Sequence, residues 1–139
     1  LSSGTAILQF VQQQIKAGQP SCLAKLAEFS GKDISLAALN GDELANIAYQ
    51  RAGKFLGIAV ANFLHILNPS IVIFGGGVSQ VGELLLAPMR ASLEESIMSK
   101  EYLNGLEISL AKLGDDVGLK GALALLLTES SQPIPDSFS

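Results

Sequence analysis

Apolar residues recur with helical spacing through the first part of the chain. From Leu1 to Ala17 they fall every three or four positions, with three glutamines on the opposite side, which predicts a helix. Gly18 and Pro20 are expected to end it. A second short helix is predicted from Ser21, as N-cap, to Phe29. The pattern over Asp33–Leu39 is less regular, and a short helix is the better interpretation.

A much longer helix is predicted next. Either Asn40 caps it, with Glu43 at the third position, or Asp42 caps it directly. Helical periodicity continues from there to about Leu67. The second half, Phe55–Leu64, is apolar nearly all round, which predicts a helix inside the domain. The apolar stretch is too short and too polar to span a bilayer.

Two short segments are predicted to be strands. Ile71–Phe74 is an unbroken run of β-branched and aromatic residues between Pro69 and a glycine turn, as in a strand buried on both faces. Leu106–Ala111 alternates apolar and polar residues, so one of its faces is expected to be wet. If the two strands are neighbours, they are expected to be parallel, with a right-handed crossover between them.

The crossover is predicted to be a helix from Ser79 or Gln80 to about Met98, which Pro88 either bends or marks as its true start. A last helix is predicted over Val117–Leu127. These elements make an α/β domain over residues 1–127, helix-rich with a short central sheet, followed by a flexible tail over residues 128–139. Two strands are too few to cover the long helix. Either the first 39 residues contribute more sheet, or the chain is a piece of a larger protein.

Composition narrows the class of protein. The chain has 139 residues, of which 48% are apolar and 16% charged, enough for one stable core. Its net charge is −4 and it has no Lys/Arg cluster, which argues against nucleic-acid binding. The one cysteine, Cys22, allows neither an internal disulfide nor a cysteine metal cluster, and favours a reducing compartment, the cytoplasm. The first residues lack a signal peptide and an initiator methionine, so the chain is expected to begin within a protein.

The glycine turn after the first strand is the best candidate site. The backbone of Gly75, Gly76, Gly77 and Val78 could approach a nucleotide closely, because the glycines have no Cβ. The common phosphate-binding fingerprints are absent, since Gln80 stands where one of them needs its last glycine. On spacing alone, a tight packing turn is the favoured interpretation.

Other candidate residues have structural explanations. His65 lies on an apolar helix face, which is typical of a core histidine. Asp115–Asp116 could bind magnesium, but an acidic helix cap is the simpler interpretation, and the same holds for Asp42–Glu43. Ser79 lacks the context of a nucleophile elbow. The residues by themselves form no complete catalytic set.

Three separated motifs, in this order, resemble the C-terminal part of the ROK family (repressors, open reading frames and sugar kinases). Two shorter segments, Ser3–Ile7 and Gly41–Ala45, fit the same pattern. The motifs are Leu67-Asn-Pro-Ser-Ile-Val-Ile-Phe-Gly-Gly-Gly-Val-Ser79, Gly82-Glu-Leu-Leu-Leu-Ala-Pro88 and Leu113-Gly-Asp-Asp-Val-Gly-Leu-Lys-Gly-Ala122.

The resemblance implies an actin-like, ribonuclease-H-like fold of two lobes with ATP in the cleft, of which this chain is the C-terminal lobe. Kinases of the family transfer the γ-phosphoryl group of Mg-ATP to a hexose, commonly glucose. Their glycine turn lies on the adenosine side of the nucleotide, which carries over to Gly75, Gly76, Gly77 and Val78. The implied partners are the N-terminal lobe of the same protein, the nucleotide, a hexose and a second subunit in a homodimer.

The sequence lacks several motifs of the family, and their absence bears on the activity expected of the chain. The family's phosphate loop, aspartate base, sugar-binding segment and zinc motif all belong upstream of Leu1, and Cys22 does not fit the zinc motif. The chain alone is therefore expected to be inactive as a kinase. The alternative parent is a sugar-responsive repressor, in which this lobe senses and dimerises. In either case, the apolar stretch Phe55–Leu67 predicts that the isolated chain folds but associates through apolar surface.

Overall fold

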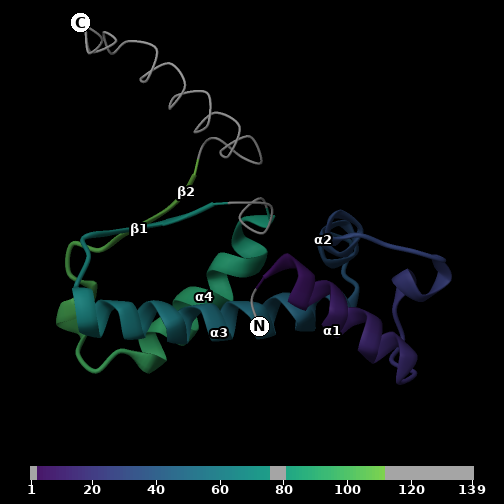
Figure 1. Cartoon of the computed structure of the whole chain (residues 1–139), viewed down its shortest axis with the longest axis horizontal. Helices are drawn as coiled ribbons and strands as arrows, with labels where there is room; N and C mark the ends of the chain where they lie inside the picture. The colour runs from purple at the N-terminus through teal and green to yellow at the C-terminus, as the bar shows by residue number, and fades with distance from the viewer. Residues whose placement is uncertain (1–2, 76–80, 112–139) are drawn as a thin grey trace, which may run out of the picture.

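The computed structural model describes residues 3–75 and 81–111. The long helix α3 runs through the molecule, with a two-stranded sheet beside one end and α1 and α2 beside the other (Figure 1). In chain order the elements are α1 (Gly4–Lys16), η1 (Cys22–Lys25), α2 (Gly31–Leu39), α3 (Glu43–Leu67), β1 (Ile71–Phe74), α4 (Glu83–Ser96), η3 (Lys100–Leu103) and β2 (Glu107–Leu110).

The first predicted helix is confirmed as α1, and the second is shorter than predicted. Ser21 is the N-cap as expected, since its hydroxyl accepts a hydrogen bond from the Leu23 N–H at 3.1 Å. Only one 3₁₀ turn follows, and the backbone is extended again at Leu26. Leu23 is buried but Leu26 is 48% exposed, so no second turn of apolar contacts stabilises a longer helix.

Asp42, not Asn40, caps the long helix. Its Oδ1 accepts a hydrogen bond from the Ala45 N–H at 2.9 Å. Asn40 is instead the C-cap of α2, which begins at Gly31, two residues before the predicted start. The predicted end of α3 at Leu67 is confirmed.

α3 and α4 cross at two glycines. A Cβ added to Gly53 would lie 2.6 Å from Cγ of Pro88, and one added to Gly57 would lie 2.8 Å from the backbone nitrogen of Leu93. The absence of side chains therefore lets the two helices touch. The buried Ser92 hydroxyl donates to the Lys54 carbonyl at 2.9 Å and closes the contact with a hydrogen bond.

α4 is shorter at both ends than the predicted crossover helix. It begins after Gly82, and Ser79 and Gln80 lie outside the described residues. Pro88 lies in its interior, so Pro88 does not mark its start. The start was misplaced because serine is a common N-cap, whereas the observed N-cap is Gly82, with a positive φ of 59°.

β1 and β2 are parallel neighbours, as predicted, with Val72 opposite Ile108. The prediction that β1 is buried on both faces is wrong for the described part of the chain. Val72 and Phe74 pack against the core shared by α3 and α4. Ile71 and Ile73, on the other face, are 45% and 59% exposed. The sheet therefore flanks the helices instead of lying at the centre, although the helix-rich α/β class is confirmed.

The second half of α3 is also only half covered. Val60, Ala61 and Leu64 are buried, whereas Phe63 and Ile66 are 58% and 77% exposed. The prediction that this half lies inside the domain is therefore wrong for residues 3–75 and 81–111, because α4 and the sheet pack on one side of it. Within these ranges, no helix is both long and apolar enough to cross a membrane. The predicted helix Val117–Leu127 and the tail from residue 128 lie outside the described residues.

Candidate functional site

The structure describes the glycine turn only at Gly75; Gly76, Gly77 and Val78 lie outside the described residues. Gly75 follows β1 and is exposed. A Cβ added to it would meet only the Cβ of Ala111, at 3.6 Å, an ordinary van der Waals distance. Among the described residues, packing therefore gives no reason for a glycine at position 75. Nucleotide binding by the turn stays a prediction.

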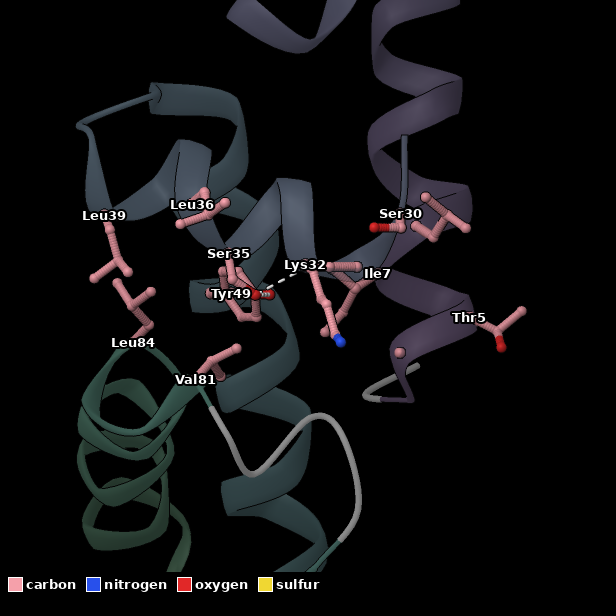
Figure 2. Close-up of a pocket in the computed structure, with 13 residues that line it drawn as sticks. Thr5, Ile7, Ser30, Lys32, Ser35, Leu36, Leu39, Tyr49, Val81 and Leu84 are labelled. Carbon is pink, nitrogen blue, oxygen red and sulfur yellow. Dashed lines mark hydrogen bonds between the residues drawn. The ribbon is translucent and has the colours of Figure 1, made fainter. Parts of the chain in front are cut away.

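A pocket of about 820 Å³ lies between α1, α2, α3 and the start of α4 (Figure 2). Val81, the first described residue after the glycine turn, is one of its lining residues. The complete lining is Gly4, Thr5, Ile7, Leu8, Ser30, Gly31, Lys32, Ser35, Leu36, Leu39, Tyr49, Val81 and Leu84.

The first turns of α1 and α2 lie at this pocket, and each is held by a helix cap. Ser3 caps α1 by accepting a hydrogen bond from the Ala6 N–H at 3.3 Å, which positions Gly4 and Thr5. At the start of α2, a carboxylate oxygen of Asp33 accepts hydrogen bonds from the Ser30 N–H at 2.8 Å and the Ser30 hydroxyl at 2.7 Å. These hydrogen bonds from Ser30 lower the pKa of Asp33. The carboxylate therefore stays ionised and holds the edge of the pocket at Ser30 and Gly31.

The lining is mostly apolar, with a few polar groups. Ile7, Leu36, Leu39 and Leu84 supply much of the apolar surface. Leu36 and Leu39 are 59% and 69% exposed, which is unusual for leucines of a helix that already buries Ile34. Such a lining, with few polar groups, is typical of pockets for flat organic ligands. A hexose, whose hydroxyls need many hydrogen-bond partners, would fit it poorly.

The charge of the lining is opposite to that of the chain. Of the described lining residues, one is charged, Lys32, in a chain with net charge −4. Lys32 therefore offers a positive group to an anionic ligand, although the ionised carboxylate of Asp33 is hydrogen-bonded to Ser30 at the edge of the pocket.

Ser35 and Tyr49 form a polar pair at one side of the pocket, where Figure 2 shows them close together. Their hydroxyl oxygens lie 2.8 Å apart. Burial raises the pKa of Tyr49, an effect only partly offset by the hydrogen bond with Ser35. The phenol is therefore protonated at neutral pH.

The other sequence candidates have structural roles. Nε2 of His65 accepts a hydrogen bond from the Met98 N–H at 3.1 Å, and its ring lies edge-on to Tyr102, as expected for a structural histidine. Asp42 is a helix cap, as the simpler interpretation held. Cys22 is exposed and free. Residues 3–75 and 81–111 hold no group of three side chains suited to a metal ion. Ser79 and Asp115–Asp116 lie outside these ranges.

The sequence analysis missed most of the pocket. It did not single out Lys32, Ser35, Leu36 or Tyr49. One signal was available: α2 carries leucines on the side opposite its buried Ile34, and apolar residues on both sides of a short helix indicate either a second contact or a ligand.

The sequence of this chain is similar to those of known proteins. The family model described as "ROK family" matches residues 1–129. The chain is 35% identical to a glucokinase from Thermotoga maritima over 130 residues, which is 91% of this chain and 41% of that protein. It thus spans about two fifths of that relative's length.

Two solved structures are also similar. One is a ROK family glucokinase from Streptomyces griseus in complex with glucose and AMPPNP, with a TM-score of 0.76 and 31% identity over 89% of this chain and 42% of that one. The other is a ROK family transcriptional regulator, a homologue of the Escherichia coli MLC protein, with a TM-score of 0.70 and 34% identity over 78% of this chain and 27% of that one. The chain therefore belongs to the ROK family.

Proposed function

We propose that this chain is the C-terminal, nucleotide-side lobe of an ATP-dependent hexose kinase. In this proposal a longer protein with an actin-like, ribonuclease-H-like fold transfers a phosphoryl group from Mg-ATP to a sugar hydroxyl, as in a glucokinase. The similarity to a glucokinase over 91% of the chain supports the reaction class. The Streptomyces griseus glucokinase, which was solved with glucose and AMPPNP, supports the ligands.

The observation that carries the proposal is the pocket between α1, α2, α3 and the start of α4. It has room for a nucleoside, an apolar lining, one lysine and no described carboxylate in its lining. Apolar side chains such as Leu36 and Leu84 would contact the faces of the base, and the ammonium group of Lys32 would attract the phosphates. At Gly75 the missing side chain would let the backbone approach the ligand.

The proposal also accounts for the exposed apolar surface. Ile71 and Ile73 form the open face of β1, and Phe63 and Ile66 form the open side of α3. The chain spans 41% of the Thermotoga maritima glucokinase. We therefore propose that an N-terminal lobe, and in a homodimer a second subunit, cover such surfaces. In this proposal the N-terminal lobe also supplies the aspartate base, so this chain alone transfers no phosphoryl group.

ATP binding by the 139-residue chain tests the proposal. Leu36→Trp would fill the pocket at a position that is already 59% exposed. Leu26→Trp, at a leucine 48% exposed and outside the pocket lining, is the matched control. We expect calorimetry to show ATP binding by the wild type and by Leu26→Trp, and its loss in Leu36→Trp. The longer protein should also phosphorylate glucose. No ATP binding by either wild-type protein would contradict the proposal.

The alternative is the sensing and dimerisation lobe of a sugar-responsive repressor. The similarity to the transcriptional regulator, at 34% identity, favours it specifically. The two functions differ in the pocket. A repressor lobe needs no nucleotide, so the wild type and both tryptophan variants would all fail to bind ATP, and the longer protein would bind DNA without phosphorylating sugar.

A further inference from the structure

The Ser35–Tyr49 pair has a fixed hydrogen-bond direction. The Ser35 hydroxyl donates its only proton to the Gly31 carbonyl, at 2.9 Å. At the 2.8 Å contact between Ser35 and Tyr49, the proton must therefore come from the phenol of Tyr49. The two hydrogen bonds therefore run from Tyr49 to Ser35 and from Ser35 to Gly31, and both hydroxyl protons are used.

This run of hydrogen bonds leaves the two hydroxyls able only to accept hydrogen bonds from a ligand. With both protons committed, the remaining capacity of the two hydroxyls is their lone pairs. Both residues line the pocket, and they come from different helices, α2 and α3 (Figure 2). A bound group that offers an N–H can be accepted there, whereas a carbonyl oxygen would face lone pairs.

We infer that the Ser35–Tyr49 pair selects a 6-aminopurine over a 6-oxopurine in this pocket. The inference rests on the proposed nucleotide site and adds its specificity. The exocyclic amino group of adenine donates to the free lone pairs. The carbonyl of hypoxanthine or guanine could be accommodated only if Tyr49 or Ser35 gave up its present bond. A difference of one hydrogen bond corresponds to roughly a tenfold preference.

The hydroxyl of Tyr49 is not needed for packing. Its ring lies among buried alanines and Ile34 in the core cluster, where a phenylalanine would pack as well. In Tyr49→Phe, Ser35 keeps its bond to Gly31, so no donor is left unpaired. This variant is therefore expected to fold.

The experiment measures the affinities of ATP and ITP for the 139-residue chain by calorimetry. ITP replaces the 6-amino group by a 6-oxo group. We expect the wild type to prefer ATP by roughly tenfold. In Tyr49→Phe the Ser35 hydroxyl still donates to Gly31 and still offers only lone pairs to a ligand, so the preference for ATP should persist. Tyr102→Phe removes the chain's other phenol, outside the pocket lining, and should leave the preference unchanged.

A second variant, Ser35→Ala, should lower the preference for ATP over ITP. In Ser35→Ala the proton of Tyr49 becomes free to donate to a carbonyl, so the preference should fall because ITP binds more tightly. A purely structural loss would not strengthen the binding of any ligand. Ser35→Ala therefore decides the test, with circular dichroism to show that it folds.

The outcomes separate the two claims. If the wild type binds ATP and ITP equally, or if the full preference survives in folded Ser35→Ala, the inference is overturned while the nucleotide site stands. If the wild type binds neither nucleotide, the proposed function is overturned and the inference with it.

Discussion

The glycines of α3 and the glycine after β1 lie in opposite environments. Gly53 and Gly57 are buried against α4, where an added Cβ would meet backbone atoms at 2.8 Å. At Gly75 the nearest atom to an added Cβ is the Ala111 side chain, at 3.6 Å. The first two are explained by the protein's own packing. Among the described residues, packing does not explain Gly75, and our proposal that a ligand approaches its backbone would explain it.

The middle and the N-terminal end of α3 are stabilised differently. Its middle is in close contact with α4 at Gly53 and Gly57 and accepts a hydrogen bond from Ser92 at the Lys54 carbonyl. Its N-terminal end depends on the carboxylate of Asp42, which accepts from the Ala45 N–H, the Cys22 N–H and the Ser21 hydroxyl. At the N-terminal end these polar contacts add to the burial of Leu44, Ala45 and Ala48 in the core.

Gly57→Ala should have the largest effect on stability. Its Cβ would overlap the backbone of α4, and backbone cannot move aside as a side-chain end can. We expect a loss of about 2–4 kcal/mol in the free energy of unfolding, measured by urea denaturation. Gly31→Ala is the matched control, because nothing lies within 4 Å of its Cβ. Equal stabilities for the two variants would show that the crossing is looser than the structure has it.

Asp42→Ala should have the next largest effect, about 1–2 kcal/mol at neutral pH, because the cap of α3 is lost. Partial burial of Asp42 raises its pKa, but the hydrogen bonds from Ala45, Cys22 and Ser21 outweigh burial and lower the pKa below its ordinary value of 3.8. The contribution of the ionised carboxylate is therefore complete above the unfolded-state pKa and lost as pH falls through the lower folded-state pKa.

Urea denaturation between neutral and strongly acidic pH measures this dependence. The difference in unfolding free energy between wild type and Asp42→Ala should shrink below pH 3.8. Asp42→Asn keeps an oxygen for Ala45 without the charge, and should lose less. A difference that does not change with pH would mean that the charge of Asp42 does not matter.

Ile73→Lys should change stability by less than about 0.5 kcal/mol, because the side chain is exposed on the open face of the sheet. It should reduce self-association of the chain at high concentration, measured by light scattering. Val72→Lys, on the packed face, should instead destabilise the fold. If the wild type is strictly monomeric at high concentration, the expectation of association through apolar surface fails.

Local sequence signals predicted where the helices and strands lie better than they predicted which of their faces are buried. The apolar period of α3 and the run Ile71–Phe74 define their elements within the local chain, and both were identified, whereas Asp42 was one of two candidate caps. What covers an apolar face depends on residues distant in sequence. The exposure of Ile73 therefore could not be predicted from an apolar run alone.

The candidate site was predictable in part, for the same reason. The glycine turn was visible because its residues are consecutive. The pocket brings together Thr5, Lys32, Tyr49 and Val81 from four separate segments, which no local pattern relates. Gly53 and Gly57 were likewise overlooked, because their role depends on Pro88 and Leu93 in another helix.

The most direct test of the central claim is Gly75→Ala, with unfolding free energy and ATP affinity measured on the same protein. We predict a stability within about 0.5 kcal/mol of the wild type, because the added Cβ finds room, and an ATP affinity reduced by at least roughly tenfold, because the backbone is no longer bare. Unchanged ATP binding, or a marked loss of stability, would show that Gly75 serves the fold and not a nucleotide.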